Sequence, residues 1–185
     1  MKASSGGTQK VYFMITVLSR SRYKHVSFLG RPFTTADVIR AHEAAFDHFS
    51  GMPQQMVYDQ DKLMVVSENR GDILFTEKFK AYLKVRKFEI FVCRRSDPET
   101  KGKSESVVKY VKTNFLNGRL FINAEVLNAE CGAWLERTGN GQVHGTTKRI
   151  PAQDFLEEQK HLNALGSVSL DTVSYTHLRA HETRP

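Results

Sequence analysis

Short apolar runs with the composition of β-strands alternate along this chain with segments of helical periodicity. Two runs near the start, 11–17 and 23–29, are rich in β-branched and aromatic residues, and the turn-like stretch Ser19-Arg20-Ser21-Arg22 separates them. They predict a β-hairpin. Two later runs, 55–58 and 88–93, are predicted strands that follow helical segments. This alternation predicts an α/β class, with an antiparallel hairpin attached to a parallel part.

Four segments have apolar residues at helical spacing. Thr34 or Thr35 is the expected N-cap of the first helix, and Thr76 is that of the second. Between these two helices, Glu68 to Asp72 form a predicted turn between short extended pieces. The first helix is predicted to end before Gly51 and Pro53, the second at about Arg86, and the other two to cover about 103–116 and about 123–137. The last helix is expected to bury Val126, Leu127, Ala133 and Trp134.

Length and composition limit the class of protein further. With 185 residues, of which 40% are hydrophobic, the chain can bury one core and is short for two. No stretch approaches the run of about 18 apolar residues that a membrane helix needs, and residues 1–10 lack the apolar part of a secretory signal. Cys93 and Cys131 lie far apart without nearby Cys or His, which indicates free buried thiols. The 27 basic and 20 acidic residues give a net charge of +7, which favours a polyanionic partner such as nucleic acid.

Two carboxylates stand out by their predicted positions. Asp59 follows the strand 55–58, at the strand end where open α/β sheets collect functional groups, and Glu105 lies early in the third helix. Carboxylate oxygens are the ligands that Mg²⁺ prefers, and a two-metal site can activate and stabilise the reacting oxygens of phosphodiester chemistry. Taken singly, an Asp at a strand end is more often a turn former, and a Glu between lysines is more often part of a solvated face.

The third helix carries a basic ridge beside Glu105. Lys101 and Lys109 flank Glu105 at i−4 and i+4, and Lys112 follows at i+7. The neighbouring face of the helix is apolar and is expected to face the core through Val108, Val111 and Phe115. Lysines in this position would hold phosphate groups next to the carboxylates.

Successive blocks of the chain resemble the integrase core of IstA-type transposases, in the same order and with matching gaps. The resemblance covers residues 11–157, far more than one short motif. The blocks are Val11–Met14 with Val17–Tyr23, Arg31–Thr35, Gly51–Pro53, Val57–Asp61, Cys93–Glu99, Val107–Lys112 and Trp134–Gly141.

The resemblance implies a ribonuclease-H-like fold, a mixed sheet flanked by helices, whose Asp, second Asp and Glu bind two Mg²⁺ (or Mn²⁺) ions. Asp59 matches the second Asp and Glu105 matches the Glu, so both are the implied catalytic and metal-binding residues. The family usually has Val and Asn around this Glu, where this chain has Ser104 and Ser106. The implied activity is 3′-end processing and strand transfer of insertion-sequence DNA.

The resemblance also implies where the chain departs from its family. The first Asp of the family sits on the central strand, just before the strand matching 11–17, and this chain has no Asp before Asp37. Asp37 belongs to the capped first turn of a helix, so it cannot take that place. We therefore interpret residues 1–10 as a polar leader from an internal start, 11–157 as a partial catalytic core without its central strand, and 158–185 as a tail outside the domain. Residues 173–183 resemble the translation of a sequencing adapter.

The resemblance implies several partners. They are DNA, both the element ends and the target, other copies of the same protein, and an AAA+ ATPase helper, in the bacterial cytoplasm at the nucleoid and without a membrane. The residues expected to bind DNA are Arg94, Arg95, Lys101, Lys103, Lys109 and Lys112.

Three readings of the function stay open from the sequence. The first is a transposase core, which in this shortened form is expected to be inactive. The second is a non-catalytic fragment that binds DNA or poisons oligomers. The third is a ribonuclease-H-like nuclease that hydrolyses without joining.

Other candidate residues have weaker support. His42 and His48 are six apart, on different faces of one helix, and are expected at a surface or packed edge rather than as zinc ligands. Asp61 could share metal binding with Asp59, although a turn residue is the commoner role. His144 has a structural, DNA-backbone or catalytic role. The pair His177 and His181 falls in the adapter-like tail, so its metal-ligand spacing carries no meaning.

Overall fold

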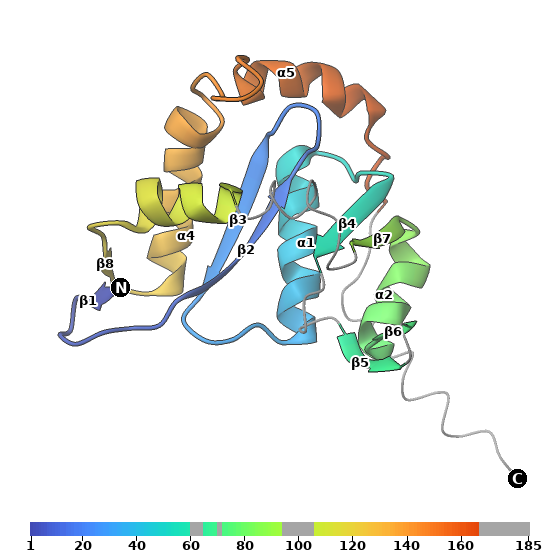
Figure 1. Ribbon diagram of the computed structural model, residues 1–185, viewed down its shortest axis with the longest axis horizontal. Coiled ribbons are helices and arrows are strands. Elements are labelled where there is room, and N and C mark those ends of the chain that lie inside the picture. Colours follow the sequence, from blue (N-terminus) through green and yellow to red (C-terminus); the bar gives the residue numbers. More distant parts are fainter. Residues whose placement is uncertain (60–64, 70–71, 94–105, 167–185) are drawn as a thin grey trace, which may run out of the picture.

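A central helix, α1, separates two small pairs of strands (Figure 1). The computed structural model describes residues 1–59, 65–69, 72–93 and 106–166, with only the backbone for residues 59, 65–69, 72–74 and 93. On one side of α1 lies a hairpin, and on the other lie β4, β7 and α2. The strands are β1 Lys2–Ala3, β2 Tyr12–Val17, β3 Lys24–Leu29, β4 Gln55–Asp59, β5 Val65–Asn69, β6 Asp72–Phe75, β7 Glu89–Cys93 and β8 Leu120–Phe121. The helices are α1 Thr35–Phe49, α2 Glu77–Arg86, α4 Ala124–Trp134 and α5 Pro151–Glu158; residues 106–111 are also α-helical.

The predicted hairpin is confirmed. Strands β2 and β3 pair in antiparallel register, with Phe13 opposite Phe28. Arg22 has a left-handed backbone conformation (φ 63°), which lets the chain reverse between the strands. The turn is held from outside, because the Glu158 carboxylate of α5 accepts hydrogen bonds from the backbone N–H groups of Arg20 and Ser21.

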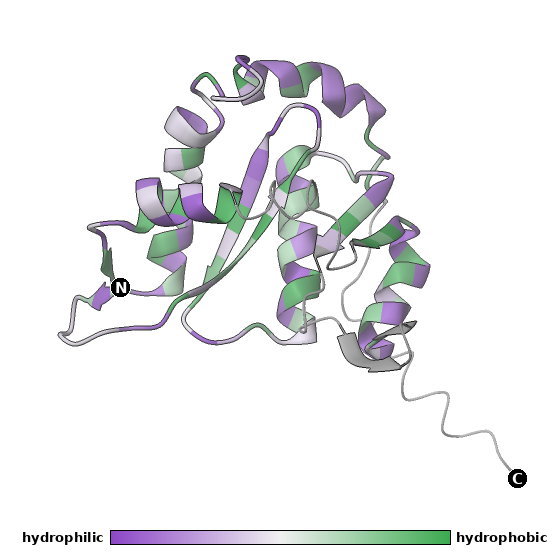
Figure 2. Ribbon diagram, in the orientation of Figure 1, coloured by the Kyte–Doolittle hydropathy of each residue, from purple (hydrophilic) through white to green (hydrophobic). Residues whose placement is uncertain are grey.

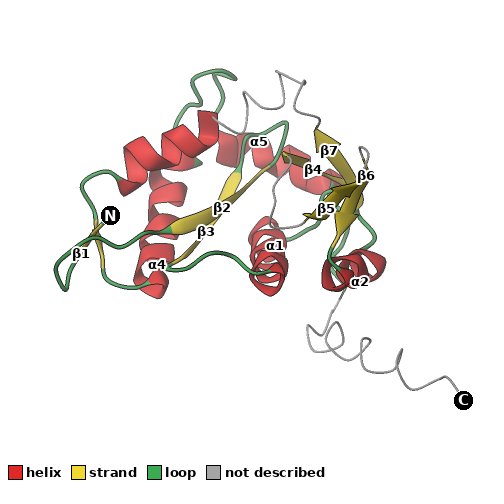
Figure 3. Ribbon diagram, turned by 60° about the horizontal axis from the view of Figure 1, so that its bottom comes forward, coloured by secondary structure: helices red, strands yellow, loops and turns green. Residues whose placement is uncertain are grey.

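The hairpin has apolar side chains on both faces. Tyr12 and Met14 pack against the core formed with α1, α2 and β4. Phe13 and Phe28 belong to a second core, formed with α4 and the helical residues 106–116. In Figure 3, α1 and α2 lie below the strands, and the segment 106–116 lies above the hairpin. The hairpin is therefore covered on both faces, as in a three-layer α/β arrangement.

Helix α1 forms as its sequence predicts. The Thr34 side chain accepts from the backbone N–H of Asp37, the Asp37 carboxylate accepts from the N–H of Thr34, and Ser50 ends the helix in a left-handed conformation. Its apolar stripe is buried, and the alternation of green and purple along α1 in Figure 2 follows this pattern. The buried apolar residues of α1 are Val38, Ile39, Ala41, Ala45, Phe46 and Phe49.

The second strand pair is parallel. Strand β4 runs beside β7 with Met56 opposite Ile90, and α2, capped by Thr76, joins the intervening β5–β6 hairpin to β7. Phe79 and Tyr82 of α2 are fully buried against α1. Of the turn predicted at 68–72, residues 70 and 71 lie outside the described residues; β5 extends to Asn69 and β6 begins at Asp72.

The sequence predicted a mixed sheet that lacks its central strand, and the structure has the two parts of that sheet as separate strand pairs. Within the described residues, β2 pairs only with β3 and β4 only with β7, so the antiparallel and parallel parts are separate two-stranded sheets. Helix α1 connects them by packing on both. The mixed α/β class is confirmed, and the ribonuclease-H-like order of strands stays a prediction.

Two other expectations need correction. Ala133, expected in the core, is exposed, because α4 buries the stripe of Leu127, Cys131 and Trp134 instead. After Trp134 the chain continues as a π-helical turn, Leu135–Gly139. The second expectation concerns the residues after 158, which were predicted to lie outside the domain. In the structure, Asn163 forms a β-bridge with Met52. Leu162 packs against Gly51, where an added Cβ would lie 2.7 Å from the Cβ of Leu162.

Two asparagine side chains close the outer edge of β3. Asn140 is buried; its Oδ1 accepts from the N–H of Lys24 at 3.0 Å and its Nδ2 donates to the C=O of Lys24 at 2.9 Å. Asn128 makes the same pair of bonds with Phe28, at 2.8 and 3.0 Å. Each amide thus replaces one residue of a neighbouring strand, which protects an edge that would otherwise be free to pair.

We expect Asn140→Ala to lower the free energy of unfolding by about 2 to 4 kcal/mol, because it leaves two buried backbone groups without partners. Asn128→Ala should lower it by about 1 to 2 kcal/mol, since water reaches this half-buried position. Urea unfolding followed by circular dichroism measures both, with exposed Asn117→Ala as the control. Equal losses of unfolding free energy at positions 128 and 140 would contradict the conclusion that burial makes the hydrogen bonds of Asn140 the more important pair.

Candidate functional site

Asp59 lies where the sequence placed it, at the carboxyl end of a strand. It is the last residue of β4, in register with Cys93 at the end of β7. Because the two strands are parallel, both ends open at the same edge of the pair. The Asp59 side chain, Asp61 and Glu105 lie outside the described residues, so the meeting of Asp59 and Glu105 stays a prediction.

The residue before Asp59 is anchored in the core by a buried histidine. His42 is fully buried, and its Nδ1 lies 2.7 Å from the carbonyl oxygen of Val38. Since a carbonyl only accepts, Nδ1 carries the hydrogen of the neutral ring, and Nε2 accepts from the Tyr58 hydroxyl at 2.7 Å. Burial lowers the pKa of His42 from 6.5 to about 4, which keeps the ring neutral at pH 7. This hydrogen bond fixes the end of β4 from the core side.

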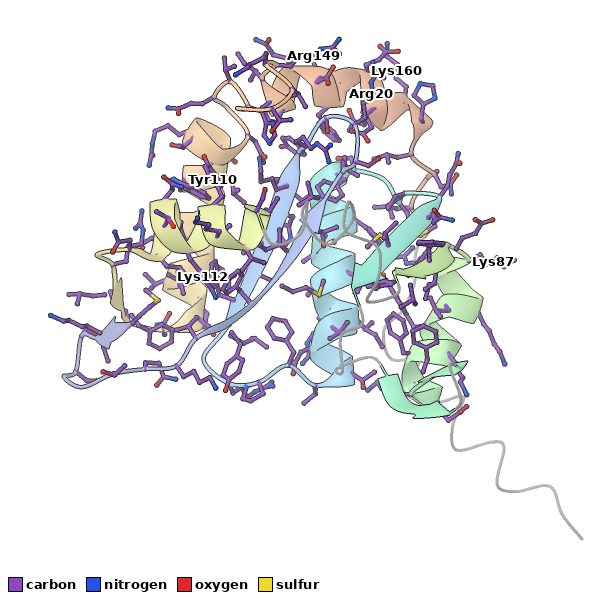
Figure 4. The ribbon with its side chains drawn as sticks, viewed as in Figure 1. Arg20, Lys87, Tyr110, Lys112, Arg149 and Lys160 are labelled. Carbon is purple, nitrogen blue, oxygen red and sulfur yellow. The ribbon has the colours of Figure 1, made fainter. Side chains whose placement is uncertain are left out.

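The helical segment that follows Glu105 has the predicted two faces. Val111 and Phe115 are buried against the hairpin, and Val108 is half-buried. Lys109 and Lys112 are exposed. After residue 111 the helix continues as a π-helical turn, Lys112–Leu116. Figure 4 labels Lys112 and Tyr110 on this segment. Lys109 and Lys112 are therefore open to solvent, and their place in a basic ridge beside Glu105 stays a prediction.

The other residues predicted to bind DNA cannot be placed. They fall outside the described residues and are Arg94, Arg95, Lys101 and Lys103. Labelled cations elsewhere do not gather with Lys112: Arg20, Arg149 and Lys160 lie along the top of the molecule near α5, and Lys87 lies beyond α2 (Figure 4). In the part of the chain that the structure describes, no three His, Cys, Asp or Glu side chains converge as metal ligands.

Of the two histidines of α1, only His42 differs from its predicted setting. His42 lies in the core among aromatic rings rather than at a surface or packed edge. His48 is half-buried, and its ring stacks on Tyr23 with the centroids 5.1 Å apart. The helix turns about 100° per residue, so the two rings face different neighbours, as the six-residue spacing predicted.

Asp37 is confirmed as a structural residue. Its buried carboxylate accepts from Arg31, Arg40 and the N-cap residue Thr34. The Arg31 guanidinium, opposed by burial and helped by Thr34 and Arg40, holds the pKa of this carboxyl well below its usual range. Cys131 is a free thiol in the core, and burial raises its pKa to about 12, so it is inert as a nucleophile.

The sequence analysis missed a buried cation. Lys24 is only 2% exposed, and its Nζ donates to the carbonyl oxygen of Gly139 at 2.6 Å. Asn140 lies in a block that resembles the transposase family, but its contact with Lys24 joins residues 116 apart in sequence. No local pattern could have indicated that contact.

Comparisons with known proteins identify the class. The transposase for insertion sequence element IS21-like of Bacteroides fragilis is 51% identical over 158 residues, which cover 85% of this chain and 30% of that protein. The transposase for insertion sequence element IS21 of Pseudomonas aeruginosa is 30% identical over 176 residues, covering 95% and 45%. The putative transposase for insertion sequence element IS5376 of Geobacillus stearothermophilus is 26% identical over 179 residues, covering 95% and 43%. The relatives are all named as insertion-sequence transposases.

Within that class, the chain is homologous to the IS21-type transposases, and the resemblance to IstA-type proteins is confirmed. The chain spans 30% to 45% of the length of these relatives. No family model matches it. Among the described residues, there is no helix of the length and apolarity needed to cross a membrane.

Proposed function

We propose that this sequence is part of the catalytic core of an IS21-type transposase, which cleaves and joins the DNA ends of its element. The observation that carries the proposal is the 51% identity to a relative named as a transposase, over 85% of this chain. Because the chain spans 30% of that relative, the activity is proposed for the longer protein that contains these residues.

Two features of the fold support the assignment of roles. Asp59 ends a parallel strand whose neighbouring residue, Tyr58, is anchored by His42. The helical segment after Glu105 buries Val111 and exposes Lys109. In this arrangement Asp59 and Glu105 hold the metal ions, and Lys109 neutralises phosphates of the bound DNA.

Mg²⁺ suits the donor set, since both predicted ligands are carboxylates and hard cations prefer oxygen. Bound there, the metal ions would stabilise charge on the scissile phosphate and promote ionisation of the attacking hydroxyl. The protein's own part is to fix the carboxylates on rigid elements and to keep the strand end in register through His42 and Tyr58. Multimers on DNA and an ATPase helper belong to the same proposal.

The proposal is tested in a full-length IS21-type transposase that carries these residues. Asp59→Asn and Glu105→Gln should each reduce Mg²⁺-dependent strand transfer on element-end DNA by at least about 1,000-fold, because each removes a charged metal ligand. Glu125→Gln, at an exposed position in the first turn of α4, is the matched control and should keep full activity.

The products separate the competing functions. Hydrolysis without joining would replace the transposase by a nuclease, and DNA binding with neither reaction would favour a non-catalytic fragment. Full strand transfer by either the Asp59 or the Glu105 variant would overturn the site itself.

A further inference from the structure

Lys24 is a buried cation without a counter-charge. Its side chain lies beneath the surface at the start of β3, held by the carbonyl oxygen of Gly139 and by the ring of Tyr110, whose centroid is 5.9 Å from Nζ. Among the described residues, no carboxylate forms an ion pair with Lys24. Lysine is almost never fully buried unless it is paired, because an ammonium loses its hydration there. An anion bound nearby would supply the missing charge.

The surroundings of Lys24 are positive. Burial lowers the pKa of Lys24 from 10.5 to about 8, and the positive charge of Arg22 is the second cause. Burial also lowers the pKa of His144, with the charges of Lys24 and Arg22 as further causes. The hydrogen bonds of Lys24 with Gly139 and Asn140 hold the start of the 140–150 loop, which carries His144, against the hairpin two residues after Arg22.

His144 offers a hydrogen-bond donor to this cluster. Its Nδ1 accepts from the backbone N–H groups of Thr146 and Thr147, each at 3.3 Å. The hydrogen of the neutral ring is therefore on Nε2, which can donate even when the ring is uncharged. The same loop holds the Thr147 hydroxyl, a buried polar atom with no hydrogen-bond partner in the described part of the chain.

The acidic residue that contacts the hairpin turn does not neutralise the cluster. Glu158 places its two carboxylate oxygens on the backbone N–H groups of Arg20 and Ser21. Arg22 itself is half-exposed and has no salt bridge among the described residues. The guanidinium is thus available to a ligand from solvent.

We propose that Arg22, Lys24 and His144 form a binding site for a phosphate group, which in the working protein is a backbone phosphate of DNA. Arg22 and the Nε2–H of His144 make the direct contacts, and Lys24 contributes charge from beneath. Naming DNA as the source of the phosphate rests on the proposed function; the affinity for phosphate does not. Tyr110, which contacts Lys24, belongs to the helical segment that follows the predicted catalytic Glu105, so the bound phosphate would lie beside that segment.

The first experiment uses inorganic phosphate alone. At tens of millimolar, phosphate should raise the melting temperature of this chain by about 2 to 4 °C relative to chloride at equal ionic strength. Lys24→Met and Arg22→Gln should each abolish the rise. Lys84→Met, which removes an exposed cation of α2, should keep it. Should Lys24→Met fail to fold, the half-exposed Arg22→Gln carries the test.

The second experiment measures the binding of a DNA duplex across a salt series. Each phosphate contact contributes about 0.9 to the slope of log affinity against log salt concentration, so Arg22→Gln should reduce the slope by about one. Lys84→Met should leave it unchanged. A phosphate-dependent rise in melting temperature without a change of slope would show that the phosphate does not come from DNA.

A melting temperature that is the same in phosphate and chloride would overturn the site altogether. Strand transfer that survives Asp59→Asn bears on the proposed function alone and leaves the phosphate site standing, so the two failures can be told apart.

Discussion

Arg86→Met should lower the free energy of unfolding by about 3 to 5 kcal/mol, one of the largest effects expected for a residue outside the candidate site. Arg86 donates through two nitrogens to both carboxylate oxygens of Glu43, and Tyr82 donates to the same carboxylate at 2.6 Å. The side chains of Arg86 and Glu43 are only 8% and 12% exposed. Removing the guanidinium would leave a buried carboxylate without its cation.

The pKa of Glu43 reflects the same balance. Burial raises this pKa, but hydrogen bonds from Arg86 and Tyr82 lower it by more, so the net direction is downward. Without Arg86 the raising effect of burial dominates, and Glu43 takes up a proton at a higher pH. The loss of stability should therefore be larger at pH 8 than at pH 5, where protonation relieves the uncompensated charge.

A double variant separates the charge from the packing. Glu43→Gln combined with Arg86→Met keeps an oxygen acceptor for Tyr82 and removes both charges, so it should recover at least half of the stability lost in Arg86→Met. Lys160→Met breaks an exposed ion pair with Glu157 and should leave unfolding unchanged. Urea unfolding measures all three. An Arg86→Met variant as stable as the parent would contradict a structural role for the pair.

Local rules predicted most of the elements of this fold. Thr34 and Thr76 are capping residues whose side chains bond within three residues, so a short stretch of sequence contains the whole interaction. The hairpin was predictable for the same reason, since the two apolar runs and the turn at 19–22 are contiguous. The placement of the two strand pairs about α1 depends on contacts between residues far apart in sequence, which no local pattern encodes.

In the candidate site, too, some residues could be predicted from local sequence and others could not. The position of Asp59 at a strand end follows from the apolar run before it. The role of His42 does not, because its partner Tyr58 lies 16 residues away and a histidine in a helix is ordinarily a surface residue. Lys24 and Asn140, 116 residues apart, could be found only from the fold. Thus a local sequence pattern indicated the predicted catalytic residue Asp59. No local pattern indicated His42, which supports the end of β4, or the buried cation Lys24.

Acid should begin to destabilise this chain below about pH 6.5, before most of its carboxylates are protonated. Burial lowers the pKa of His42 from 6.5 to about 4, and burial with the neighbouring His48 lowers that of His25 to about 4. Below pH 6.5 these histidines bind protons in the unfolded chain but stay neutral in the folded chain. Their contribution to stability is therefore complete above this pH and decreases until about pH 4. His48 and His144, shifted in the same direction, add to the slope.

The size of the effect follows from linkage. The difference at His42 between a pKa of 6.5 in the unfolded chain and about 4 in the folded chain corresponds to about 3 kcal/mol, and His25 adds up to about the same. For a domain whose whole stability is about 5 to 15 kcal/mol, this loss is enough to unfold much of the chain. The depressed carboxyl Asp37 contributes in a different window, below its ordinary pKa of 3.8.

The double variant His42→Phe with Tyr58→Phe tests this assignment, since it removes both polar partners and keeps the aromatic packing against Phe88. In urea unfolding at pH 7, 6, 5 and 4, the double variant should lose about 3 kcal/mol less than the parent between pH 7 and 4. His161→Gln, at an exposed position, is the control and should follow the parent curve. If the double variant follows the parent curve as well, protonation of His42 is not the cause of the loss of stability in acid. The hydrogen bond between His42 and Tyr58 then does not make the end of β4 sensitive to pH.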